Sequence, residues 1–253
     1  MKSITRNLIP ALILSLASSC SSTSTAKKSV TIDGLLNIAA AAINEGDHIM
    51  ALETLNQVRE LDASNPRAYH LYALAYLGKQ EIGLAEHAAR QAIRLDPKYS
   101  IAKNTLGKIL IDLGKFTEAE SELKQAAGDL LNREADRAKL NLGILYQKTM
   151  KPDLAEYWLK RAAEDRSAMA CVAHYQLGKI HLEKNELPLA ERSFRMSTKG
   201  TCSGMTETHL AVGQTLTRLR RYDEARAKFI EIQRLFPGTE ASEKAFEYLR
   251  EIP

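Results

Sequence analysis

The chain has few of the residues that interrupt helices and few that build metal or disulfide frameworks. Its 253 residues include 13 glycines, 7 prolines and 3 cysteines. Apolar and polar residues do not alternate with period two over any useful length, so strands are not expected. The prolines of the main part of the chain lie at the boundaries of segments whose apolar residues repeat with a helical period. The composition therefore favours an all-α chain.

Motifs for catalysis and for metal binding are also missing. No close pair of cysteines occurs and the six histidines are scattered, so the sequence predicts no zinc site. It contains no glycine-rich phosphate loop, no nucleophile elbow and no HExxH pair. We therefore predict a protein that is not an enzyme, with no cofactor, no metal and no small-molecule substrate.

The balance of charge gives no reason to expect a nucleic-acid partner. The formal net charge is +4, and removal of residues 1–19, which hold Lys2 and Arg6 and no acid, leaves +2. The densest basic group is formed by Arg218, Arg220 and Arg221, for which a solvated surface is the preferred interpretation. Such a balanced chain lacks the basic patch that attracts nucleic acid.

The first twenty residues have the layout of a secretory signal. Lys2 and Arg6 give a basic start, and the apolar run from Leu8 to Ala17 is too short to span a bilayer comfortably. Residues 16–20 (LASSC) resemble the lipobox of bacterial lipoproteins, in which the signal is cut before an acylated cysteine. We expect residues 1–19 to be a signal peptide and Cys20 to be lipidated. Plain secretion is one alternative, and a cytosolic adaptor follows if the signal is not cleaved.

The residues after Cys20 predict where the protein goes and how it is held. Ser21 follows the cysteine, whereas many Gram-negative bacteria use Asp there to retain lipoproteins at the inner membrane. We therefore expect an outer-membrane protein that faces the periplasm. Each buried CH2 of its acyl chains contributes about 0.8 kcal/mol, so several chains anchor it stably. Residues 20–31 are small and polar, and we expect them to form a flexible tether.

One pattern recurs about six times: a small residue within a helix, a turn, and an alanine followed four residues later by a large apolar residue. Gly107, Ala119 and Leu123 form one copy. The period of roughly 34 residues is typical of tetratricopeptide (TPR) repeats, and mid-helix glycine, which costs about 0.5–1 kcal/mol against alanine, indicates close packing between paired helices. We predict an all-α TPR superhelix. Its predicted repeats are 32–65, 66–99, 100–133, 136–169, 171–204 and 206–239, and 240–253 form a capping helix.

Two cysteines lie at the two ends of the fifth predicted repeat. Cys171 opens the first helix of this repeat, and Cys202 lies just past the end of its second helix. An antiparallel helix pair brings those two ends together, and disulfides persist in the compartments that exported proteins reach. We therefore predict a disulfide between them, with two free thiols as the alternative.

The concave wall of a TPR stack is formed by the first helix of each repeat. In the N-terminal repeats the wall positions are rich in Leu and Ile that packing within a repeat does not require. We predict a groove that takes an apolar or amphipathic peptide. The alternative is that superhelical curvature buries part of this wall. The predicted groove residues are Leu36, Ile43, His70, Leu74, Leu77, Lys108 and Ile111.

Two stretches of the chain resemble the type IV pilus pilotins, the family of PilF, PilW and Tgl. Residues 138–162 (AKLNLGILYQKTMKPDLAEYWLKRA) are similar to the family's fourth repeat, and residues 230–249 (IEIQRLFPGTEASEKAFEYL) to its ending. The resemblance implies a protein on the inner leaflet of the outer membrane that binds secretin subunits. It further implies that the protein promotes localisation and oligomerisation of the secretin ring, while acylated Cys20 anchors the protein in the lipid bilayer.

A second role fits the same features. A periplasmic TPR lipoprotein could instead be a scaffold for cell-wall enzymes or for the assembly of outer-membrane proteins. This role needs the same signal, anchor and repeats as the first. The sequence therefore leaves the alternative open.

Overall fold

The computed structural model describes residues 21–164 and 169–253. The predicted signal peptide and Cys20 lie outside the described residues. Within these ranges the chain forms 13 α-helices, one short 3-10 helix and no strand, which confirms the all-α prediction. The elements are α1 (Ser21–Glu45), α2 (His48–Leu61), α3 (Pro66–Gly78), α4 (Ile82–Leu95), α5 (Ser100–Asp112), α6 (Phe116–Gly128), α7 (Ala135–Lys148), α8 (Pro152–Glu164), α9 (Met169–Glu183), α10 (Leu187–Ser197), η1 (Gly200–Cys202), α11 (Thr206–Arg218), α12 (Tyr222–Leu235) and α13 (Glu240–Glu251).

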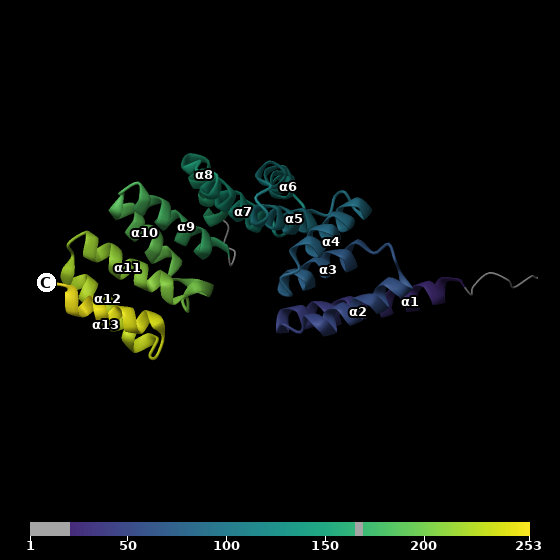
Figure 1. Cartoon of the computed structure of the whole chain (residues 1–253), viewed down its shortest axis with the longest axis horizontal. Coiled ribbons are helices and arrows are strands. Elements are labelled where there is room, and N and C mark those ends of the chain that lie inside the picture. Colours follow the sequence, from purple (N-terminus) through teal and green to yellow (C-terminus); the bar gives the residue numbers. More distant parts are fainter. Residues whose placement is uncertain (1–20, 165–168) are drawn as a thin grey trace, which may run out of the picture.

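The helices pack in pairs, and the pairs follow one another along an arch (Figure 1). Each predicted repeat corresponds to one pair, from α1 and α2 at one end to α11 and α12 at the other. The first helices of neighbouring repeats touch, so α3 contacts α1 and α5, and α7 contacts α5 and α9. In Figure 1, α5 and α7 lie on the inner side of the arch while α6 and α8 lie outside it. The first helices therefore form the inner wall.

The segment predicted to be a flexible tether is helical. α1 begins at Ser21 and continues without a break to Glu45, so residues 21–31 belong to this helix, and their role as a tether stays a prediction. No proline or glycine lies between Ser21 and Asp33, and the usual signals that end a helix are therefore missing. The first helix of the array extends back toward Cys20 as a result.

The two helices of each repeat are joined by the same turn. In every repeat a backbone N–H just after the turn donates to a carbonyl five residues earlier, as from Glu81 to Tyr76 (2.9 Å) and from Lys151 to Tyr146 (2.8 Å). This is the hydrogen bond of a Schellman motif, which places the preceding residue in the left-handed region. The residues with positive φ at these turns are Gly46, Gln80, Gly114, Met150, Asn185 and Arg220.

The mid-helix glycines bring paired helices into close contact, as their recurrence predicted. A Cβ atom on Gly107 would lie 2.4 Å from Cγ of Leu123, and one on Gly178 would lie 2.5 Å from the ring of Phe194. Gly143 and Gly213 meet Leu159 and Phe229 in the same way. The large residue is thus always sixteen positions after the glycine, on the facing side of the hairpin.

Helix α13 covers the last pair. Its Tyr248 ring stacks on Phe229 of α12, with centroids 5.0 Å apart and planes 6° from parallel. The Tyr248 hydroxyl also accepts a hydrogen bond from Gln214 of α11 (2.9 Å). Repeat arrays need such a cap because the last repeat otherwise exposes an apolar face.

Candidate functional site

The structure divides the predicted groove residues into buried and accessible ones. Leu36, His70 and Ile111 expose only 1%, 7% and 4% of their surface. A partner cannot reach them in the folded chain, so the prediction of a groove role was wrong for these three. Their positions lie where successive first helices meet, and superhelical curvature covers them there. The alternative interpretation of the wall is therefore correct at these residues.

Polar side chains join the first helices at this buried layer. Nε2 of His70 on α3 lies 3.0 Å from the Thr105 hydroxyl on α5. Asn141 on α7 donates to the Asn104 carbonyl oxygen on α5 over 2.9 Å, and both amides are buried. Burial and the positive charge of Arg67 lower the pKa of His70 to about 4, so its ring is neutral at pH 7. These contacts join the first helices of neighbouring repeats through buried polar side chains.

The accessible part of the predicted groove comes from three successive first helices. Ile43 on α1 and Leu74 and Leu77 on α3 are half-buried and pack on the apolar core. Lys108 on α5 is exposed, and its ammonium lies 3.2 Å from the Asp112 carboxylate. The first helices therefore offer half-buried apolar side chains on α1 and α3 and an exposed ion pair on α5. A peptide-binding role for these four residues stays a prediction.

The two cysteines of the fifth repeat are joined in the structure. The disulfide links Cys171 on α9 to Cys202 on η1, with Cα atoms 5.9 Å apart. Both residues are buried. The bond ties the start of the repeat's first helix to the segment that follows its second helix, and so closes this repeat on itself.

The outer side of the arch carries ion pairs that the sequence analysis missed. Glu86 on α4 accepts hydrogen bonds from Arg90 (2.9 Å) and from Lys115 at the next turn (2.7 Å), and Arg90 continues to Glu118 on α6 (2.7 Å). The hydrogen bond from Lys115 lowers the pKa of Glu86. The Glu86 carboxylate thus pairs with one basic side chain of its own helix and with one basic side chain of the next repeat.

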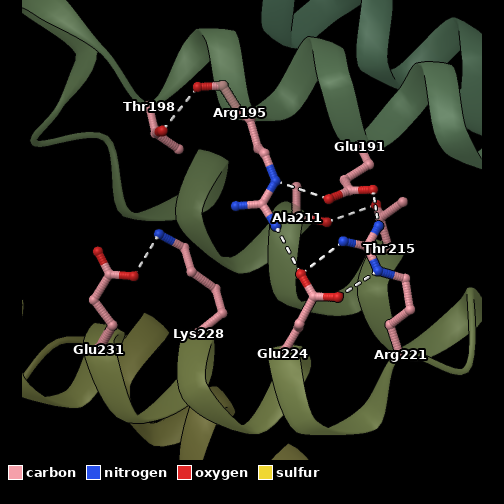
Figure 2. A network of polar contacts seen from close by, with 9 residues as sticks. All are labelled: Glu191, Arg195, Thr198, Ala211, Thr215, Arg221, Glu224, Lys228 and Glu231. Carbon is pink, nitrogen blue, oxygen red and sulfur yellow. Dashed lines mark hydrogen bonds and ion pairs between the residues drawn. The ribbon is translucent and has the colours of Figure 1, made fainter.

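The same arrangement returns between α10 and α12 (Figure 2). Glu191 accepts from Arg195 on its own helix (2.8 Å) and from Arg221 of the next repeat. Arg221 also donates to both carboxylate oxygens of Glu224, each over 2.6 Å. The sequence signal is a glutamate directly after the alanine in four of the six second helices, α4, α6, α8 and α10. It occurs at Glu86, Glu120, Glu156 and Glu191.

Two further features of the described residues bear on the kind of site. None of the helices in 21–164 and 169–253 is long and apolar enough to cross a bilayer. Over the same ranges, no three His, Cys, Asp or Glu side chains come together as metal ligands would.

The comparisons with known proteins agree with this architecture. A family model described as a tetratricopeptide repeat matches residues 73–130 and 104–170. The type IV pilus assembly protein PilF of Pseudomonas aeruginosa is 23% identical over 208 residues, which cover 82% of this chain and 81% of PilF. The chain thus contains TPR repeats and is homologous to PilF.

Solved structures show the same fold. A structure of Pseudomonas aeruginosa PilF has a TM-score of 0.72 at 19% identity and covers 86% of this chain and 97% of its own. PilW, a widely conserved type IV pilus biogenesis factor, gives 0.73 at 20% identity, with 85% and 98% covered. YrrB, a TPR protein with an unusual peptide-binding site, gives 0.53 at 19% identity, with 76% and 97% covered. The fold of about 85% of the chain is thus shared with the two pilus proteins.

Proposed function

We propose that this protein is an outer-membrane-anchored TPR lipoprotein that binds secretin subunits and promotes their localisation and oligomerisation for type IV pilus assembly. The observation that carries the proposal is the homology to PilF, a type IV pilus assembly protein, over 82% of this chain. The similar arches of PilF and PilW support it. The proposal assigns the chain a binding role without chemistry.

The helical start of the chain sets the geometry of the proposed anchor. Acylated Cys20 would directly precede α1, which begins at Ser21 and forms part of the first repeat. Eleven helical residues before Ile32 span about 16 Å, because an α-helix rises about 1.5 Å per residue. The lipid would therefore hold the N-terminal repeats close to the membrane surface, and their inner wall with them.

The inner wall would supply the contact with the secretin. Ile43, Leu74 and Leu77 form its accessible apolar strip, and Lys108 lies on the next first helix. Amphipathic segments bind such strips through apolar anchors spaced along one face. A secretin segment bound there would stay soluble until contacts with neighbouring secretin subunits replace its contacts with the inner wall.

A complementation experiment tests the proposal in cells. A strain that lacks the protein is expected to lose surface pili and secretin multimers in the outer membrane, and the wild-type gene restores both. Cys20→Ala should leave multimers misplaced, and the pair Leu74→Glu with Leu77→Glu should fail to restore them. Leu84→Glu, at an exposed position on α4, is the matched control and should restore both.

Other outcomes would contradict the proposal. Normal pili and multimers in the deletion strain would remove the link to the secretin. Defects confined to cell shape or to the assembly of other outer-membrane proteins would favour the alternative scaffold role. Fatty-acid labelling that survives Cys20→Ala would exclude the proposed anchor.

A further inference from the structure

Ion pairs of one kind join neighbouring second helices at two places in the array, and we call each such contact a rung. In a complete rung, a basic residue of one second helix meets a glutamate near the start of the next. Arg90 and Glu118 form this contact between α4 and α6 at 2.7 Å. Arg195 and Glu224 form it between α10 and α12 at 3.7 Å. Each glutamate directly precedes the alanine of its helix.

The junction between α8 and α10 lacks this glutamate, as do those between α2 and α4 and between α6 and α8, where Leu84 and Leu154 precede the alanine. Lys160 occupies the position of the two arginines, but Leu189 stands where they meet an acid. The Lys160 ammonium instead pairs with Glu156 of its own helix at 2.7 Å. Leu189 is exposed, so the change has not moved it into the core. An exposed apolar side chain therefore stands at a position where two other second helices, α6 and α12, carry an ion-paired glutamate.

A cavity of about 370 Å³ opens at this incomplete rung. It lies between α8, α9 and α10 and includes His181, Leu189 and Ser193 in its lining. His181 and Ser193 stand where the preceding repeat has the larger Tyr146 and Trp158. The side chains of His181 and Ser193 are smaller than the pair that occupies these positions in that repeat.

The lining of the cavity is apolar with a positive rim. Leu177 lines the cavity deep in the hairpin, and exposed Leu189 and Met196 flank it. Arg192 also lines the cavity and forms no ion pair with any described residue. The rim thus offers cations near apolar surface, which suits an acidic amphipathic ligand.

The one acid in the lining is already neutralised. Glu156 accepts from Lys160 at 2.7 Å and from Lys184 at 2.8 Å, and these two hydrogen bonds lower its pKa to about 2. It stays ionised and paired at neutral pH. It therefore does not offset the charge of Arg192.

We propose that this outer cavity docks an amphipathic segment of a partner protein. An apolar side chain of the segment enters between Leu189 and Met196. A Glu or Asp of the segment faces Lys160 and Arg192, and so takes the place that Glu118 and Glu224 hold in the complete rungs. The site is lined by α8, α9 and α10 and includes none of Ile43, Leu74, Leu77 and Lys108, and it depends on neither the lipid anchor nor secretin binding.

A designed pair of peptides tests the proposal on the purified full chain. The first is a fluorescein-labelled helical peptide with leucine at every third or fourth residue and glutamate between the leucines. The second carries lysine in place of each glutamate. Fluorescence anisotropy should show saturable binding of the first peptide and binding at least tenfold weaker for the second.

Two leucine variants locate the site. Leu189→Glu supplies the missing acid of the rung and should weaken binding of the glutamate peptide at least tenfold, with unchanged circular dichroism and melting temperature. Leu154→Glu changes the equivalent, exposed residue of α8, which is outside the cavity lining, and should bind as the wild type does. Arg192→Ala should weaken binding about threefold or more.

Three results would overturn the proposal. These are the absence of saturable binding, equal binding by Leu189→Glu and wild type, or equal binding of the two peptides. Leu189-dependent binding to phosphatidylglycerol vesicles without binding of the glutamate peptide would assign the surface to a membrane instead. The inner-wall variants of the proposed function leave this surface intact, so failure of one proposal is distinguishable from failure of the other.

Discussion

Gly143 of α7 lies directly beneath Leu159 of α8, and a Cβ atom on the glycine would be 2.5 Å from the leucine side chain. Gly143→Ala therefore forces the two helices apart or moves Leu159, and such overpacking costs about 1–3 kcal/mol. Equilibrium urea unfolding followed by circular dichroism should show a lower free energy of unfolding.

The matched control for this change is Gly83→Ala. Gly83 lies in α4, and an added Cβ would meet nothing within 4 Å. The same substitution should there raise the free energy of unfolding by about 0.5–1 kcal/mol, the helix preference of alanine. Equal effects at the two sites would contradict the close-packing account.

Removal of the disulfide should destabilise the C-terminal repeats selectively. Cys171 and Cys202 are 31 residues apart, and loop-closure entropy for a bond of this span gives about 3–4 kcal/mol. In the double variant that carries both Cys171→Ser and Cys202→Ser, amide hydrogen exchange should accelerate in α9 and α10. Amides of α3 and α4 should keep their protection because each repeat contacts only its neighbours. Uniform acceleration along the array would be inconsistent with this local clamp.

Replacement of one residue that has a positive φ at an inter-helix turn should stabilise the protein. Met150 has φ of 56° and is 85% exposed, so replacing it loses little packing. Met150→Gly should raise the free energy of unfolding by about 1 kcal/mol, because an L-residue pays roughly 1–2 kcal/mol in this conformation. Lys148→Gly, two residues earlier inside α7, should lower it by about 0.5–1 kcal/mol. Thermal or urea melts of the two variants check the opposite signs.

Acid should weaken the contact between α3 and α5 through His70. Its pKa is about 4 in the folded chain against 6.5 for the free group, because burial disfavours the charged ring. Below pH 6.5 the unfolded chain binds the proton first, so this stabilisation is lost as pH falls from 6.5 toward 4, by about 1 kcal/mol per pH unit. His70→Gln should remove that slope from the free energy of unfolding, whereas His87→Gln, at an exposed position, should not. Identical slopes for all three proteins would refute a role for His70.

The fold could be predicted because its determinants are local and repeated. The pairing of Gly107 with Leu123 depends on residues within one hairpin, and the 34-residue period repeats that pairing. The turn residues with positive φ could be predicted from the sequence only in part. Gly46 and Gly114 mark them, but Gln80 and Met150 adopt the same conformation because the hairpin imposes it. The helical start of α1 could not be read from its small polar residues.

The surfaces could be predicted less well because they depend on how repeats stack. Leu36 and Ile111 occupy wall positions in the sequence, yet the curvature of the array buries them. The outer ion pairs join residues far apart in the chain, as Glu191 and Arg221 do. The sequence indicates them only through the glutamate that follows the alanine in four of the six second helices, and a single repeat does not reveal which basic residue that glutamate meets.

The central claim is that the inner wall binds secretin subunits, and a direct titration tests it most sharply. The secretin of the same organism would be titrated into the purified full chain, as wild type, as Leu74→Glu with Leu77→Glu, and as Leu84→Glu. We expect binding by the wild type and by Leu84→Glu, and at least tenfold weaker binding by the inner-wall pair at unchanged helicity. No binding by the wild type, or equal binding by all three proteins, would contradict the account.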